Sequence, residues 1–315
     1  MSRVAIVGCG VVGSSWALVF SRAGFEVSIY DASPAARDNT VAFVRTALAD
    51  LQAQGLGGTV PQDAVMARLS TAASLEEALA GCDYVQESAP ERLELKRDLY
   101  RTLDALAPPH VTIGSSTSGL PASSFTEGLT HARRCLVVHP INPPHLIPLV
   151  EIVPAPWTAP EVVDQAVEIM RRVGQSPIRL SREIAGFVVN RLQSALLGEA
   201  FRLVEDGICD AGDVDQAVAD GLGLRWFFMG PFETIDLNAQ QGIAEYCRNL
   251  GPMYHDLAKE QADPRAWGPA LVKTVEDQRR RLTPAEGLSA RRSWRDRCLA
   301  ALVAAKRQVL SEQGR

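Results

Sequence analysis

The first half of the chain alternates short apolar runs with longer stretches whose apolar residues recur at helical spacing. The short runs, which have the pattern of buried strands, occupy residues 4–7, 27–30, 84–86, 111–114 and 135–138. Strands that alternate with helices are typical of a parallel sheet covered by helices. The pattern therefore predicts an α/β domain.

One interval in this alternation is unusually long. Between the second and third predicted strands, residues 34–68 have a helical pattern that is broken by glycines near residues 55–58. Glycine clusters of this kind end helices. We therefore expect a two-helix insertion after the second strand of a doubly wound fold.

The second half of the chain is helical throughout. Apolar residues recur at helical spacing from Phe187 to Val204, until Gly207 ends the run. This spacing predicts one long buried helix, and the helical pattern continues to the end of the sequence. The chain is thus predicted to form an α/β domain over residues 1–183 and an all-α domain over residues 184–315.

Composition supports an ordinary globular protein. The chain has 315 residues, 46% of them hydrophobic and 22% charged, and a net charge of −5, which argues against a nucleic-acid surface. Its apolar runs are too short to span a bilayer, and it starts with a strand instead of a signal peptide, so we expect a cytoplasmic protein. The six cysteines lack the spacing of a zinc site or a disulfide framework, so we expect reduced thiols and no metal.

A glycine-rich loop follows the first predicted strand and opens a helix. Gly8, Gly10 and Gly13 match the pattern G-x-G-x-x-G. The first glycine allows a tight turn, the second lets a pyrophosphate approach the backbone, and the third lets the helix pack closely on the strand. The first amides of the helix, at Val11 and Val12, attract phosphate. In this context the loop predicts a Rossmann-type dinucleotide-binding domain.

Asp31 ends the second predicted strand. An acidic side chain at this place binds the hydroxyls of the adenosine ribose and repels the 2′-phosphate of NADP. We therefore expect NAD as the cofactor. The alternatives are that the glycines only mark a turn, that Asp31 only caps the next helix, or that the loop belongs to a methyltransferase.

His139 and Glu151 are candidates for the chemistry. His139 opens a proline-rich stretch, and Glu151 lies in the extended run 146–153 that follows. A turn followed by a strand would bring the two side chains together. Histidine suits the removal of a hydroxyl proton near neutral pH, and a carboxylate on its other nitrogen fixes the tautomer and stabilises the cation. The pair suggests a dehydrogenase; a turn histidine and a surface carboxylate are the alternative.

Several stretches resemble the 3-hydroxyacyl-CoA dehydrogenase superfamily, and most closely its λ-crystallin branch, which is similar to L-gulonate 3-dehydrogenase. The resemblance covers nearly the whole chain. It rests on GCGVVGSSWA from Gly8, QESAPERLELK from Gln86, SSTSGL from Ser115, HPINPPHLIPLVEIVP from His139, AGFVVNRLQ from Ala185, EAFRLVEDGI from Glu199, GLGLRWFFMGPFET from Gly221 and ARRSWRDRCL from Ala290. So many matches in one order are specific for the superfamily.

The resemblance implies a catalytic set of four residues. It makes His139 the general base, held by Glu151, and Ser118 a hydroxyl that bonds the reacting oxygen of the substrate. Asn190 would donate its amide to the substrate or to His139. Without the resemblance, Ser118 is not distinguished from the three preceding hydroxyl residues, any of which would cap the next helix.

The resemblance also places Glu91 and Lys96 beside the nicotinamide end of NAD. The alternative is that Glu91 begins a helix and that Lys96 lies on the exposed side of this helix.

The substrate is indicated by a departure from the family pattern. Where acyl-CoA members have Gly-Tyr-Pro-Met-Gly-Pro, this chain has a longer stretch, residues 223–231, that contains Arg225. A guanidinium binds a carboxylate with two parallel hydrogen bonds. We therefore expect Arg225 to anchor a small 3-hydroxy acid, with L-gulonate as the leading candidate for NAD-dependent oxidation. A surface arginine is the alternative.

Other functions stay open. They are a 3-hydroxyacyl-CoA dehydrogenase, for example one for 3-hydroxybutyryl-CoA, a carnitine or hydroxybutyrate dehydrogenase, and an NAD-binding structural protein of the crystallin kind without catalysis. The complete set of four residues weighs against the last. The resemblance implies a homodimer, and neither nucleic acid nor a membrane is expected as a partner.

Overall fold

The structure is a computed structural model, and it describes residues 2–56, 58 and 60–314. The chain divides into two compact units, one formed by Met1–Val189 with Asp296–Arg315 and the other by Asn190–Arg295. The sequence pattern placed the whole of residues 184–315 in the second domain, whereas residues 296–315 belong to the first unit.

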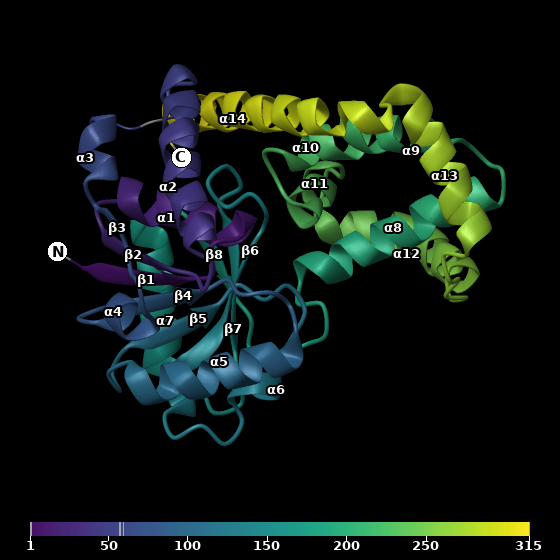
Figure 1. The fold of residues 1–315 in the computed structure, drawn as a ribbon. Coiled ribbons are helices and arrows are strands. Elements are labelled where there is room, and N and C mark those ends of the chain that lie inside the picture. The colour runs from purple at the N-terminus through teal and green to yellow at the C-terminus, as the bar shows by residue number, and fades with distance from the viewer. Residues whose placement is uncertain (1, 57, 59, 315) are drawn as a thin grey trace. The chain divides into compact units, whose positions relative to one another are not determined.

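The first unit is built on an eight-stranded sheet (Figure 1). The strand order is β3-β2-β1-β4-β5-β6-β7-β8, and all neighbours are parallel except β6 and β7. The order reverses beside β1, and ligands of α/β sheets collect at such a point. The strands are β1 (Arg3–Val7), β2 (Glu26–Tyr30), β3 (Leu69–Thr71), β4 (Tyr84–Glu87), β5 (Thr112–Ser115), β6 (Cys135–Pro140), β7 (Leu149–Pro154) and β8 (Ser176–Arg179).

Helices cover both faces of the sheet (Figure 1). On one face, α1, α2, α3 and α7 enclose the fully buried Trp16 and Phe20; on the other, α4, α5 and α6 enclose Tyr100 and Leu103. This confirms the Rossmann-type α/β fold. The helices are α1 (Val11–Arg22), α2 (Pro34–Ala53), α3 (Gln62–Met66), α4 (Leu75–Leu79), α5 (Leu93–Leu106), α6 (Ser123–Thr126), the 3₁₀ helix η1 (Ala132–Arg134) and α7 (Pro160–Arg172).

The insertion after the second strand is confirmed, since α2 and α3 both follow β2. Ser33 caps α2 by accepting a hydrogen bond from the Ala36 amide, and Pro34 fits its first position. The predicted break between the two helices includes Gly57, which lies outside the described residues. The strands β3 and β8 were not predicted, because neither is long or buried enough to show an apolar run.

The end of the chain packs on the first unit. Leu299, Ala300, Val303 and Ala304 lie on the C-terminal part of α14 (Leu288–Glu312) and contact the core around α1 and α2. Ala300 is 5% exposed. The helix therefore carries a short apolar stripe that the core of the first unit buries.

The second unit is helical, as predicted, but one expectation for it was wrong. Of α8 only Val204 is buried, and Leu192 is 63% exposed. Helical spacing identifies the apolar face of α8, and within the described chain this face is largely exposed. The elements after α7 are α8 (Val189–Glu205), α9 (Ala211–Gln216), the π-helix η2 (Ala217–Leu222), α10 (Gly223–Trp226), α11 (Pro231–Leu237), α12 (Ile243–Glu260), α13 (Pro269–Leu282), the 3₁₀ helix η3 (Ala285–Gly287) and α14.

The cysteines are free thiols in the described chain. Cys9, Cys82 and Cys135 are buried, and Cys247 is exposed. Burial raises the pKa of Cys9 and of Cys82 to about 11 and the pKa of Cys135 to about 12. No helix in the described ranges has the length and apolar character to cross a membrane.

Candidate functional site

The predicted residues of the first unit gather at one edge of the sheet. The strands β1, β2, β4, β5 and β6 are parallel, so their carboxyl ends meet the same edge. Gly8 follows β1, Asp31 follows β2, Ser118 lies in the loop after β5, and His139 is near the end of β6. We take this edge as the candidate site, because ligands of α/β folds collect there.

The glycine loop has the close contacts that its glycines require. A Cβ atom on Gly8, whose φ is +101°, would lie 2.6 Å from a carbonyl group after β4, and one on Gly13 would lie 1.9 Å from the carbonyl oxygen of Gly8. A Cβ atom on Gly10 would meet nothing within 4 Å. The loop is open at Gly10 and at Val11 and Val12, which begin α1 and are not buried. It therefore fits a pyrophosphate.

Asp31 ties the glycine loop to the start of α2. Its Oδ2 accepts a hydrogen bond from the Cys9 amide at 2.9 Å, and its Oδ1 accepts one from the Ser33 amide at 2.9 Å. The carboxylate is half-buried. Each carboxylate oxygen has a second lone pair, so the group keeps acceptor capacity for ribose hydroxyls. Ser33 and not Asp31 caps α2, so the capping alternative is wrong.

Glu91 holds the loop that carries Ser118. One carboxylate oxygen accepts hydrogen bonds from the Thr117 hydroxyl, from the Ser118 amide at 3.0 Å and from the Gly119 amide at 3.1 Å. Ser118 is exposed at the sheet edge. The sequence did not predict this contact, because the partners come from separate loops.

Lys96 is fully buried, so the alternative of an exposed lysine is wrong. Its ammonium group lies 2.8 Å from the carboxylate of Glu87 and 3.7 Å from that of Glu91. Glu87 also accepts hydrogen bonds from the Ser115 hydroxyl at 2.6 Å and from the Ala89 amide at 2.7 Å. These bonds satisfy a buried charge that would otherwise be costly. Sequence reasoning missed Glu87; the signal was an acidic residue at the end of an apolar strand.

His139 and Glu151 face each other across β6 and β7. They are direct partners in the antiparallel ladder, so their side chains lie on the same face of the sheet. Nδ1 of His139 lies 2.7 Å from Oε2 of Glu151. His139 is 4% exposed and Glu151 is 0% exposed. The structure thus brings together the two side chains that the proline-rich turn was expected to join.

The second oxygen of Glu151 is also held. Oε1 accepts hydrogen bonds from the amides of Val188 at 2.7 Å and Val189 at 3.1 Å, where the chain enters α8. Burial disfavours the charged carboxylate, but the bonds from His139 and from the two amides outweigh it and lower the pKa of Glu151. Glu151 therefore stays ionised beside His139.

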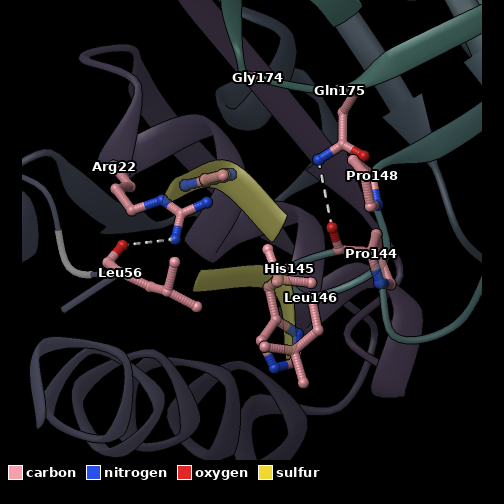
Figure 2. Close-up of a pocket in the computed structure, with 10 residues that line it drawn as sticks. Arg22, Leu56, Pro144, His145, Leu146, Pro148, Gly174 and Gln175 are labelled. Carbon is pink, nitrogen blue, oxygen red and sulfur yellow. Dashed lines mark hydrogen bonds between the residues drawn. The ribbon is translucent and has the colours of Figure 1, made fainter. Parts of the chain in front are cut away.

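The loop after His139 is anchored at a second histidine. His145 bonds through Nδ1 to the Ser15 hydroxyl on α1 at 3.0 Å, and it lines a small polar pocket with Arg22 and Gln175 (Figure 2). In the pocket, Gln175 donates a hydrogen bond to the carbonyl of Pro144 at 3.1 Å (Figure 2). The loop that follows the candidate base is therefore fixed to the helix that begins at the glycine loop.

Two predicted residues lie in the second unit. Asn190 is half-buried in α8, and Arg225 is exposed in α10, directly after the π-helix η2. π-Helical turns occur often at functional sites. Within the described ranges, no group of three His, Cys, Asp or Glu side chains could hold a metal ion.

The comparison with protein families covers almost the whole chain. Residues 3–184 match the NAD binding domain of 3-hydroxyacyl-CoA dehydrogenase, and residues 186–284 match its C-terminal domain. This agrees with the glycine loop and with the helical second unit.

Relatives and solved structures agree with this match. The chain is 44% identical to the lambda-crystallin homolog of Bos taurus over 97% of this chain and 96% of the relative. It is 38% identical to the L-carnitine dehydrogenase of Pseudomonas aeruginosa over 98% and 95% of the two chains. It also resembles the structure of the NAD⁺-dependent 5-formyl-3-hydroxy-2-methylpyridine 4-carboxylic acid 5-dehydrogenase, with a TM-score of 0.84 and 28% identity over 98% and 99% of the chains. The chain therefore belongs to the 3-hydroxyacyl-CoA dehydrogenase family and is an NAD-dependent oxidoreductase.

Proposed function

We propose that the protein oxidises the 3-hydroxyl of a small free hydroxy acid with NAD, and that L-gulonate is its leading substrate. The observation that carries the proposal is the buried pair of His139 and Glu151, joined at 2.7 Å at the edge of the sheet where the glycine loop lies. When a carboxylate binds Nδ1 of a histidine, Nε2 can accept a proton from a substrate hydroxyl.

The geometry supports acid–base roles for His139 and Glu151. Nε2 of His139 takes the hydroxyl proton, and the charge of Glu151 stabilises the resulting imidazolium. Bound NAD supplies the hydride acceptor. Ser118 lies on the loop that Glu91 holds, and the proposed hydrogen bond from its hydroxyl to the reacting oxygen rests on the family resemblance. For Asn190 and Arg225, which lie in the second unit, the proposed substrate contacts rest on the family resemblance and on residue chemistry.

A small acid is favoured over an acyl-CoA. Residues 223–231 depart from the stretch typical of acyl-CoA members and supply a guanidinium at Arg225. Two similar proteins carry names of enzymes for small carboxylic acids, L-carnitine and a pyridine carboxylic acid. L-Gulonate leads because the motifs resemble the λ-crystallin branch most closely.

L-Carnitine is the second candidate. The similarity to an L-carnitine dehydrogenase extends over 98% of the chain, and carnitine shares the carboxylate and the 3-hydroxyl with L-gulonate. The two acids differ at C2, where only gulonate carries a hydroxyl, and beyond C3, where carnitine is cationic and gulonate is polyhydroxylated.

A substrate panel tests the proposal. NADH formation is measured with L-gulonate, L-carnitine and 3-hydroxybutyryl-CoA, for the wild type and for His139→Ala, with His110→Ala as an exposed-histidine control. We expect turnover of a free acid, a loss of about 10²–10⁴ in kcat for His139→Ala because the positioned base is gone, and unchanged NADH binding. Turnover of the CoA ester alone, or full activity of His139→Ala, would contradict the proposal.

We also propose that the enzyme is a homodimer that covers the second unit. The buried hydrophobic cluster of this unit comprises only Val204, Ala211 and Leu271 among the described residues. Large apolar side chains on several helices of this unit are exposed, for example Leu192 at 63% and Phe232 at 75%, and a second copy of the chain would bury them. Sedimentation should give a dimer for the wild type and a monomer for Leu192→Glu with Phe232→Glu; a monomeric wild type would refute this part.

A further inference from the structure

The chain makes a left-handed turn directly before α8. Gly186 has a φ of +75°, and Phe187 follows with a φ of +50°. Among the described residues, Phe187 is the one non-glycine residue with a positive φ. Bulky L-residues rarely adopt this conformation, because the Cβ atom crowds the carbonyl oxygen. Such strain persists only where the surroundings enforce it.

Burial of the Phe187 ring enforces this conformation. The side chain is 0% exposed and belongs to the hydrophobic core that α5 and α6 cover. The Phe187 amide donates a hydrogen bond to the carbonyl of Ile184 at 3.1 Å, which closes the turn. Apolar burial of an aromatic ring favours the turn strongly enough to hold a backbone that Phe would otherwise avoid.

The turn delivers two contacts to the same pair of side chains. The next two amides, of Val188 and Val189, both donate to Oε1 of Glu151. The Phe187 ring itself packs beside the His139 ring, with 5.5 Å between the ring centroids and 55° between the planes. Phe187 therefore contacts His139 through its ring, and the two amides that follow it contact Glu151.

We propose that Phe187 is a positioning residue that orients both His139 and Glu151. Its buried ring limits the rotation of the imidazole, and its left-handed backbone aims the two amides at Glu151, so that the carboxylate presents Oε2 to His139. This inference rests on the proposed function, in which His139 is the base. In the sequence, Phe187 is an apolar residue at the start of a helical pattern and lies in the stretch AGFVVNRLQ, and neither feature predicts a contact with His139.

Few groups act on the charge of Glu151, so the effect of the turn on this charge can be measured in a pH profile. The pKa of Glu151 responds to burial, to His139 and to the amides of Val188 and Val189, and His139 is the one titratable partner that acts on it in the described chain. The amides of Val188 and Val189 stabilise the carboxylate anion of Glu151. Without these two hydrogen bonds, the pair of His139 and Glu151 would bind a proton more tightly. The acidic limb of kcat/KM would then move to higher pH.

The first experiment separates positioning from packing. Phe187→Leu keeps an apolar side chain but removes the ring from His139, and Phe125→Leu removes a ring from the same core, where Phe125 packs on Tyr100 instead. We expect about a tenfold loss of kcat for Phe187→Leu with an NAD KM within about twofold of wild type, and a kcat within about twofold of wild type for Phe125→Leu. Equal losses in the two variants would overturn the proposal.

The second experiment isolates the backbone. Phe187→Ala and Phe187→Gly both lose the ring, but glycine adopts a positive φ freely whereas alanine does not. The acidic limb should therefore stay in place in Phe187→Gly and move to higher pH in Phe187→Ala, in samples whose folding is verified by circular dichroism. Coincident limbs in the two variants would refute the role of the turn. If the wild type oxidises none of the acids tested, the proposed function fails instead of this inference.

Discussion

At the scale of single residues, the candidate site depends on a buried charge that protein donors stabilise. Glu151 is fully buried, yet its charge is stabilised by one imidazole nitrogen and two backbone amides. A carboxylate with three donors keeps its charge in the interior, because each donor replaces a lost water molecule. The same arrangement leaves the far side of the His139 ring as its reactive side.

Replacement of Glu151 by glutamine should weaken the base. Glutamine still accepts a hydrogen bond from Nδ1 but no longer stabilises the imidazolium that forms, so kcat should fall roughly a hundredfold. The acidic limb of kcat/KM should move to lower pH, because the neutral amide no longer favours the protonated ring. Steady-state kinetics across pH measures both effects. An unchanged limb would mean that Glu151 does not act through charge.

Asp31 should determine the choice between NAD and NADP. Asp31→Asn keeps an acceptor oxygen for the Cys9 amide, which is 2.9 Å away, but removes the charge that repels a 2′-phosphate. We expect kcat/KM with NADP to rise roughly tenfold while that with NAD falls. The ratio of the two values in the same preparation is the measurement. A ratio equal to that of the wild type would assign the discrimination elsewhere.

At the scale of elements, the loop after β5 is held by the loop after β4. Glu91 accepts hydrogen bonds from three groups of residues 117–119, and Lys96 on α5 is buried next to it. A carboxylate that accepts hydrogen bonds from consecutive backbone amides holds those residues in one conformation. The position of Ser118 thus depends on Glu91.

Glu91→Ala should reduce turnover without unfolding the protein. Loss of the three hydrogen bonds frees the Ser118 loop, so kcat should fall about tenfold. Glu94→Ala is the matched control, because Glu94 lies nearby on α5 and forms an exposed ion pair with Arg97. We expect that control to retain its kcat. Similar losses in both variants would argue against the loop as the cause.

At the scale of the molecule, His145 links three segments of the first unit. It bonds to Ser15 on α1, packs edge-on against Phe43 of α2, and lines the pocket that Val303 of α14 also lines. Burial lowers the pKa of His145 from its ordinary value of 6.5 to about 4, although the charge of Asp296 opposes this shift. His145 is therefore neutral at physiological pH.

This histidine should make stability depend on pH. Since its pKa is lower in the folded than in the unfolded protein, the unfolded chain binds the proton more tightly, and stability is lost as the pH falls from 6.5 towards 4. His145→Phe should remove up to about 3 kcal/mol of this loss. Urea unfolding of both proteins at several pH values measures it. Parallel curves for variant and wild type would contradict the assignment.

The sequence predicted local features well and long-range burial poorly. The glycine loop and the facing of His139 and Glu151 follow from short patterns, because adjacent residues determine a turn or a strand. The ion pair of Lys96 with Glu87 does not, since burial of a lysine depends on strands and helices far apart in sequence. The exposure of α8 was not predicted either. Apolar spacing identifies the apolar face of a helix, but it does not identify the element that packs on this face.

The distribution of the thiols has a practical consequence for labelling. A thiolate is the form that reacts with maleimides, and the raised pKa of the buried Cys9 keeps that thiol protonated within the glycine loop. Cys247 on α12 is exposed. A fluorophore or spin label should therefore react with Cys247 before the buried Cys9. Because Cys209 and Cys298 are partly exposed, their replacement would restrict the label to Cys247 and leave the cofactor loop unmodified.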